Sequence, residues 1–306
     1  MSVPQQPVGS PLDDALAASP AAGPRRPDEG RTARREQLRV LVRSKTFIAG
    51  AVIVGFWVLC AGFGELLAPQ DPLAPDPLND LAAPSADHWF GTDRLGRDVF
   101  SRVIVGARDI IVVAPLATLL GTVVGTALGL VTGYFRGAVD DVLSRIIDAF
   151  LALPVLILGL LAITALGPSR GTVILVIGAV FAPIIARTVR AAVLTERGMD
   201  YVAAARLRNE RTPYVLFGEI LPNVMGPVTV EFTVRLGYAI FYVATLSFLG
   251  FGIQPPAPDW GLQVFEHYGL ISGGFWWAAF FPALAIATLV IGVNLLADGV
   301  TQAFER

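Results

Sequence analysis

The sequence predicts an all-α, polytopic membrane protein with about six transmembrane helices. Of its 306 residues 54% are hydrophobic and only 16% are charged, and the mean hydropathy is +0.62. A water-soluble domain of this size needs more charge to cover its surface. Long uncharged runs also recur along the chain. A helix needs about 20 apolar residues to cross the hydrocarbon, where unsatisfied backbone groups exclude open strands.

The first element in chain order is a polar tail. Residues 1–45 are rich in Pro, Ala, Gly and Arg and lack apolar periodicity, a composition that cannot offset its ordering entropy. We expect a disordered tail on the cytoplasmic side. Because it is too long and polar for the start of a cleaved signal peptide, the apolar run within residues 46–68 is predicted to be a retained first transmembrane helix.

The remaining spans follow from the apolar runs. A span that contains Glu231 and Arg235, from about Val224 to Gly250, is less obvious but brings the expected number to six. The run beginning at Gly171 is short and can extend past two arginines by snorkelling. The clear runs are Thr46–Gly64, Ile110–Phe135, Ala149–Leu166 with Pro154 inside it, Gly171–Ala186, and Tyr268–Ala297, whose membrane part should begin near Phe275.

The distribution of basic residues predicts the topology. Seventeen of the 23 lie in the tail, in alternate connecting segments and at Arg306, whereas the intervening segments hold five. Cytoplasmic segments carry the excess of Lys and Arg, so both termini should face the cytoplasm of an inner membrane. Residues 69–109 then form an external segment and residues 110–300 the transmembrane core. Within the core lie a cytoplasmic segment, 195–223, and an external loop, 253–274; residues 301–306 are the cytoplasmic C-terminus.

The external segment contains a glycine pattern and an amphipathic stretch. Gly91–Asp98 matches the glycine spacing of a phosphate loop, but Arg97 and Asp98 stand where Lys and Ser or Thr are required, so a turn with local Asp–Arg pairs is preferred. Apolar residues then recur at helical spacing. They predict an amphipathic helix that leads into the second span and lies at the outer surface or at a rim that meets a partner. The apolar face is Val99, Phe100, Val103, Ile104 and Ala107, and the polar face is Ser101, Arg102, Arg108 and Asp109.

Two features inside the spans bear on function. A glycine at every fourth position of the second span would allow close approach of a neighbouring helix. Glu231 and Arg235 lie four residues apart on one helix face, and each would cost roughly 2.5–3.5 kcal/mol alone at mid-bilayer. They are candidates for the translocation path, with a structural bridge nearer the cytoplasmic edge as the equal alternative. The helix-packing glycines are Gly121, Gly125, Gly129 and Gly133.

The cytoplasmic segment is the most informative. Small helix-forming residues follow Asp200, a turn is expected from Asn209 to Pro213, and a second apolar stretch follows. Two short helices projecting from the membrane would leave apolar area exposed unless another subunit docks there. A generic amphipathic loop is the alternative. The apolar side is predicted to carry Tyr201, Ala204, Ala205 and Leu207.

From His88 to the C-terminus the chain resembles the permease subunits of bacterial ABC importers, in particular the C-type subunit of the dipeptide, oligopeptide and nickel family. Three blocks carry the resemblance: His88–Asp98; Tyr201–Arg206 with Ile220–Asn223; and Leu246–Gly252 with Gln254–Pro256, Trp260–Gly261 and Asn294–Gly299. In that family the second block is the coupling loop. Ala203 here replaces its usual Glu, and Asn209 replaces a Gly; Asn tolerates the left-handed conformation such a Gly adopts.

The resemblance implies a type I permease fold and a non-catalytic subunit of an ATP-driven importer of di- or oligopeptides. It implies a second, similar permease, two ATPase subunits that hold ATP and magnesium, an external substrate-binding protein and surrounding lipid. No cofactor, metal or nucleic acid is expected on this chain, whose net charge is −2 and which has one Cys and two distant His. The coupling residues it implies are Tyr201, Ala204, Ala205, Arg206, Leu207, Asn209, Leu221 and Pro222.

Three alternatives remain open. Nickel or another small solute is a possible cargo, although the chain shows no metal-ligand cluster. A secondary transporter would use inverted repeats and broken helices. Pro154 and Pro183 can break helices, but no internal duplication is visible. An intramembrane enzyme would need a nucleophile–base set, and no span contains a His or a Ser–Lys pair.

Overall fold

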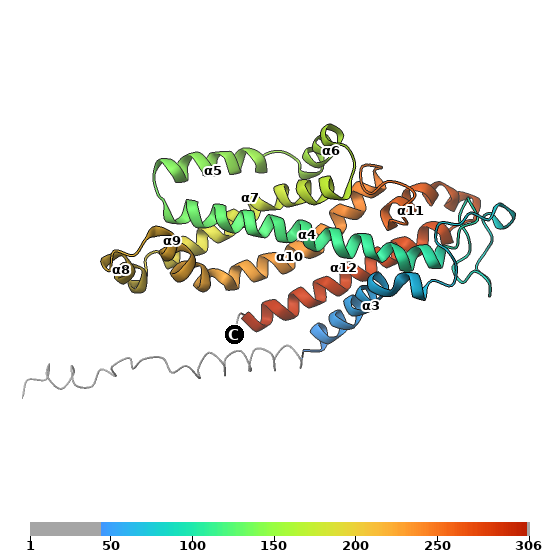
Figure 1. Cartoon of the computed structure of the whole chain (residues 1–306), viewed down its shortest axis with the longest axis horizontal. Helices are drawn as coiled ribbons and strands as arrows, with labels where there is room; N and C mark the ends of the chain where they lie inside the picture. Colours follow the sequence, from blue (N-terminus) through green and yellow to red (C-terminus); the bar gives the residue numbers. More distant parts are fainter. Residues whose placement is uncertain (1–43, 305–306) are drawn as a thin grey trace, which may run out of the picture.

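The computed structural model of the protein describes residues 44–304, so the predictions for residues 1–43 and 305–306 lie outside it. The described part is helical, and its only β pairing is an isolated bridge between Thr92 and Asp98. The longest helices run roughly side by side along the long axis in Figure 1. They are α3 (Lys45–Leu67), α4 (Val99–Tyr134), α7 (Arg170–Glu196), α10 (Leu221–Phe248) and α12 (Trp277–Phe304).

Short helices connect the long ones. On one flank, α5 (Ala138–Leu151) and α6 (Val155–Leu166) join α4 to α7. At one end of the molecule, which we call the α8 end, α8 (Asp200–Leu207), α9 (Thr212–Tyr214) and the π-helix η2 (Val215–Ile220) join α7 to α10. At the opposite end, the α11 end, lie η1 (Pro77–Asn79), α11 (Trp260–His267) and η3 (Tyr268–Gly273) (Figure 1).

Four described helices, α3, α4, α7 and α12, are long and apolar enough to cross a membrane. The pair α5 and α6, bent by 90°, gives a fifth if the two form one span. The sixth predicted span coincides with α10, which has 28 residues. Glu231 and Arg235 lower its apolarity, so the total of six remains a prediction. The last span was expected to enter the membrane near Phe275, and α12 begins two residues later.

The apolar run Ala149–Leu166, predicted as one span, is divided between two helices at Pro154, one of the two prolines that could break a helix. The helix α5 ends at Leu151, and α6 begins at Val155. Proline disfavours helical backbone in the residue before it and has no N–H to donate, so Pro154 starts a new helix instead of continuing the old one. The 12 residues of α6 extend only about 18 Å, too short to cross the hydrocarbon alone. Pro183, in contrast, lies inside a continuous α7.

The amphipathic stretch after Asp98 is the first part of α4 and leads into the second span, as predicted. Asp98 caps this helix by accepting the N–H of Ser101 at 2.8 Å. The predicted polar face is mostly buried: Ser101, Arg102 and Asp109 are each at most 5% exposed. The prediction that this stretch lies at the outer surface is wrong for this face, because the α11 end covers this part of α4.

The glycine stripe of α4 lies against α7, and this is the most extensive helix pair of the bundle. A Cβ atom added at Gly125 would lie 2.6 Å from the carbonyl oxygen of Ala182, and one at Gly129 would lie 2.7 Å from Cβ of Val189. Gly121 and Gly133 meet α7 in the same way. The two backbones can approach this closely only because the side chains are absent. The pair α4–α7 therefore forms the central packed unit.

Candidate functional site

The α8 end has the predicted helix–turn–helix form. The eight residues of α8 end at Leu207, and the chain reverses through Asn209, whose φ of +55° is left-handed. The N–H of Asn209 donates to the Arg206 carbonyl at 2.9 Å, which closes the turn. Asn is one of the few non-glycine residues that adopt this conformation readily. The second helix begins at Thr212, with Pro213 in its first turn, where a missing N–H costs nothing.

One face of α8 packs onto the rest of the protein. Val202 and Ala205 are fully buried. The hydroxyl of Tyr201 donates to a Glu196 carboxylate oxygen at 2.7 Å, which links α8 to the last residue of α7. Burial and this carboxylate raise the pKa of Tyr201 to about 12, so the hydroxyl keeps its proton at neutral pH. The buried face therefore fixes the position of α8 relative to α7.

The end of α4 is held as well. The ring of Tyr134, the last residue of α4, has the guanidinium of Arg206 5.0 Å from its centroid and that of Arg197 5.9 Å away. Both distances are within the range of cation–π attraction. A displacement of α8 would thus act on α4 and α7, the two helices that pack most extensively on each other.

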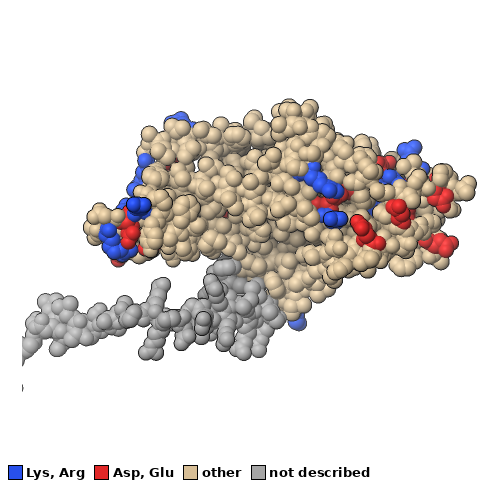
Figure 2. Space-filling view, in the orientation of Figure 1, with Lys and Arg blue, Asp and Glu red and all other residues tan. Residues whose placement is uncertain are grey.

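The opposite face of this segment is apolar and exposed. Leu207 is 84% exposed, and Tyr214 and Phe217 are 52% and 58% exposed. Ala204 and Pro222 are also exposed, and Leu221 is partly buried. Arg208, 3.3 Å from Glu219 and 3.5 Å from Glu210, adds a charged border. Figure 2 shows charged side chains at both ends of the molecule, including the α8 end, with a largely uncharged surface between them.

The predicted apolar side of α8 is therefore divided between two faces. Tyr201 and Ala205 point toward the bundle, whereas Ala204 and Leu207 are exposed. The helix is so short that small residues line both faces, and the sequence pattern could not separate them. The exposed aromatic residues Tyr214 and Phe217 were missed as site candidates. The sequence feature that could have identified them is the apolar run after Pro213. This run holds more apolar residues than one short helix can bury on a single face, so some of them must be exposed.

Glu231 and Arg235 pair with each other near the middle of α10. Arg235 Nε lies 3.0 Å from Glu231 Oε2, and the hydroxyl of Thr188 in α7 donates to Glu231 Oε1 at 2.8 Å. The side chains are 15% and 19% exposed. Arg235 also lies over the ring of Tyr238, 5.5 Å from its centroid. The pair thus joins α10 to α7 while part of each charge stays at the surface.

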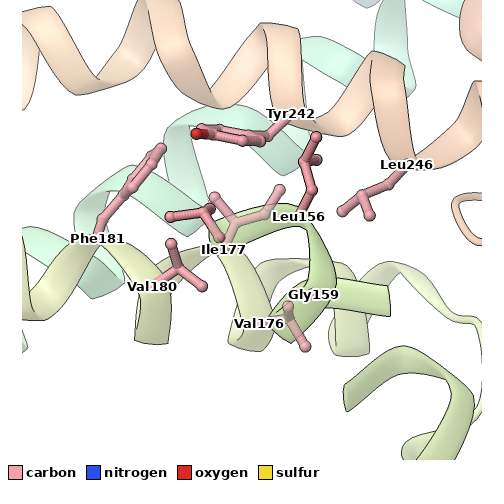
Figure 3. A pocket seen from close by; sticks show the side chains of 9 residues that line it. Leu156, Gly159, Val176, Ile177, Val180, Phe181, Tyr242 and Leu246 are labelled. Carbon is pink, nitrogen blue, oxygen red and sulfur yellow. The ribbon is translucent and has the colours of Figure 1, made fainter. Parts of the chain in front are cut away.

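A small apolar cavity lies where α6, α7 and α10 meet. Figure 3 shows its side chains converging from these helices, among them Phe181, Tyr242 and Leu246. Its volume is about 10 Å³, no more than one water position. The cavity is a packing gap, too small for a solute.

The α11 end carries a buried polar network. As predicted, Gly91–Asp98 forms a turn with a local Asp–Arg pair: Arg97 Nε lies 2.7 Å from Asp93 Oδ2, and Gly91 and Gly96 have positive φ. Arg97 also lies 3.4 Å from Glu266. Sequence analysis missed the link to Glu266, because nothing in the local sequence connects positions 169 residues apart. Among the described residues no group of three or more His, Cys, Asp or Glu could hold a metal ion.

Two family descriptions match the chain. The family described as "Binding-protein-dependent transport system inner membrane component" matches residues 125–306. That described as "N-terminal TM domain of oligopeptide transport permease C" matches residues 32–84. Among solved structures, a chain of the inward-facing methionine ABC transporter MetNI has a TM-score of 0.54 at 19% identity, covering 67% of this chain and 97% of that one. That likeness supports the fold alone.

Curated relatives are closer in sequence. The dipeptide transport system permease protein DppC of Alkalihalophilus pseudofirmus is 36% identical over 89% of both chains. DppC of Bacillus subtilis is 36% identical over 87% of this chain and 83% of its own. The glutathione transport system permease protein GsiD of Escherichia coli O157:H7 is 36% identical over 92% of both. The chain is a multi-pass membrane protein of the type I permease fold and belongs to the family of inner-membrane components of binding-protein-dependent transport systems.

Proposed function

We propose that this chain is one permease half of an ATP-driven importer of di- or oligopeptides. Its relatives carry dipeptide and glutathione in their names, and both are short peptides. The chain itself is non-catalytic in this proposal. A second, similar permease completes the path, an external binding protein delivers the peptide, and two ATPase subunits bind and hydrolyse ATP with magnesium.

The α8 end is the attachment point for an ATPase subunit in this proposal and faces the cytoplasm, as do both termini. The observation that carries the assignment is the exposed apolar face of Leu207, Tyr214 and Phe217 on a segment fixed to both α4 and α7. An apolar face that is exposed where a membrane protein meets water indicates a binding site for a protein partner. ATP-driven movement of the ATPase would move α8 and, through it, α4 and α7. The contact between the ATPase and α8 would then differ between two states of the complex, as any two-state switch requires.

The path runs beside α10. A charged pair at the middle of a membrane helix is costly in lipid, so its exposed part should meet water or another protein. The partly exposed Glu231 and Arg235 support a place on the path or on the contact with the second permease. This assignment keeps both residues as path candidates, with Thr188 as the group that orients the glutamate.

The test is Leu207→Asp in the complex reconstituted with its partners. A charge on the exposed apolar face should release the ATPase subunits and abolish peptide uptake. The control is Leu78→Asp, the same change at a side chain that is 94% exposed at the other end of the chain. It should leave the ATPase subunits bound. Stable ATPase binding with normal peptide-stimulated hydrolysis in Leu207→Asp would refute the coupling role, and uptake without any ATPase would favour a secondary transporter.

A further inference from the structure

Two aspartates of α5 pair with arginines of α7, and four apolar side chains of α5 face outward. Arg190 makes two contacts of 2.7 Å with the two carboxylate oxygens of Asp140. About two turns further along α5, Arg187 Nη2 donates to Asp148 Oδ1 at 2.8 Å. The outward face carries Val139, Val142, Ile146 and Phe150, each 44–57% exposed. The contacts of Asp140 and Asp148 with α7 form a polar seam between the two helices, and the exposed apolar side chains suit contact with lipid. The other two charged residues of α5, Asp141 and Arg145, are exposed.

The seam begins where the apolar run of α7 ends. Arg187 directly follows the run 171–186, and it lies four residues, about 6 Å along the axis, from the midpoint of the 27 residues of α7. Thr188, the next residue, contacts Glu231, which pairs with Arg235. Polar contacts therefore run from α5 across two adjacent residues of α7 to α10.

The two pairs of the seam differ in a way that suggests different roles. The Arg190–Asp140 pair is bidentate and its side chains are 34% and 13% exposed. The Arg187–Asp148 pair has a single contact, and its side chains are 67% and 57% exposed. A bidentate, covered pair holds helices together, whereas a one-contact, open pair leaves most of its hydrogen-bonding groups free. A pocket of about 140 Å³ adjoins this open pair, lined by Ser144, Ile147, Asp148, Ala186, Arg187 and Arg190.

We propose that the Arg187–Asp148 pair and its pocket form a binding site on the path for the charged ends of a short peptide. Arg187 would take the peptide carboxylate in a bidentate contact, and Asp148, released from Arg187, would take an ammonium group. The two side chains satisfy each other when no peptide is present, so the site can empty without leaving an isolated charge in the membrane. This inference rests on the proposed function and adds the groups that meet the cargo.

Thiol labelling tests whether the pocket is wet and occupied. Cys60 is the only cysteine of the chain, so Cys60→Ala gives a cysteine-free background. In this background Ser144→Cys places a thiol in the pocket, and Val142→Cys, as control, places one on the outward face of α5. In the reconstituted complex a charged thiol reagent should modify Ser144→Cys and not Val142→Cys. Transported dipeptide should slow the reaction. Equal, unprotected reaction at both positions, or none at Ser144→Cys, overturns the site.

Charge removal tests the role of the pair. Arg187→Gln with Asp148→Asn should reduce uptake of a dipeptide with free ends by about tenfold or more, the loss expected for a hydrogen bond to a charged group. Uptake of the same dipeptide with an amidated C-terminus should fall less. The uptake of each dipeptide is divided by its uptake in the unchanged complex, so that the preference of the binding protein for one dipeptide over the other cancels. ATPase subunits should stay bound, unlike in Leu207→Asp. Normal uptake by the double variant overturns this site alone, whereas normal coupling in Leu207→Asp overturns the proposed function.

Discussion

The guanidinium of Arg206 in α8 lies over the ring of Tyr134, the last residue of α4, 5.0 Å from its centroid. Arg197, just after α7, approaches the same ring at 5.9 Å. One aromatic side chain thus meets cations from α8 and from the end of α7. The contact gives the exposed segment a direct mechanical connection to the central α4–α7 pair.

Loss of the ring should weaken this connection. We expect Tyr134→Leu to leave ATP hydrolysis by the assembled complex largely intact while peptide uptake per ATP falls, because each cation–π contact at such a site contributes about 0.5–1 kcal/mol. Tyr134→Phe keeps the ring and should behave as the unchanged protein. Uptake and hydrolysis would be measured together in proteoliposomes. Equal uptake per ATP in the Leu and Phe variants would show that the ring does not transmit the movement.

The sequence was sufficient for the helices that bury apolar residues in long uncharged runs. It also predicted the turn at Asn209, since few other residues accept φ of +55°. It could not decide which proline breaks a helix: at Pro154 the apolar run continues although the helix stops, whereas α7 continues through Pro183. Hydropathy measures the environment of a segment and not its continuity, so only the backbone chemistry of proline carried that information.

The burial of Arg102 could not be predicted from its neighbours. Its side chain is 1% exposed and lies 3.6 Å from Asp93 and 3.9 Å from Glu266, residues brought together by the whole α11 end. Local periodicity placed Arg102 on the polar face of an amphipathic helix, and on an isolated helix that face would be exposed to water. Whether such a charged side chain is buried or exposed depends on residues far away in the sequence, and the same holds for the open pair of Arg187 and Asp148.

A methyl group at Gly125 should destabilise the bundle. Its Cβ would lie 2.6 Å from the Ala182 carbonyl oxygen, so α4 and α7 would have to separate. Overpacking of this kind costs about 1–3 kcal/mol. Gly55→Ala in α3 is the control, since a Cβ there meets nothing within 4 Å. Thermal unfolding in detergent should show a lower Tm for Gly125→Ala and an unchanged or higher one for Gly55→Ala. Equal Tm values would mean that α4 and α7 can shift at little cost.

Asp259 should make stability depend on pH. Its side chain is 1% exposed at the start of α11, where Oδ1 accepts the N–H of Leu262 at 2.9 Å, and Oδ2 has no hydrogen-bond partner among the described residues. Burial raises its pKa from 3.8 to about 6. The folded protein therefore binds this proton more tightly than the unfolded chain, so the contribution of Asp259 to stability falls as pH rises from about 4 to about 6 and stays low above that.

Asn at this position keeps the acceptor for Leu262 and carries no charge. Asp259→Asn should therefore raise Tm near pH 7.5 and change it much less near pH 5, where the aspartate is mostly protonated. Thermal unfolding at the two pH values measures the difference. An identical change in Tm at both would show that the carboxylate is not destabilised by burial.

The turn after α8 should tolerate glycine and reject a β-branched residue. At Asn209 the backbone is left-handed, and this conformation costs most L-residues about 1–2 kcal/mol but glycine almost nothing. Asn209→Gly should thus leave α8 in place, whereas Asn209→Val should loosen the contacts of Val202 and Ala205 with the bundle. Hydrogen–deuterium exchange of the α8 amides measures this directly. Exchange in Asn209→Val should be faster than in the Gly variant, while α4 and α7 stay protected in both. If both variants exchanged like the unchanged protein, the buried face of α8 alone would hold the segment, and the turn would be dispensable for its position.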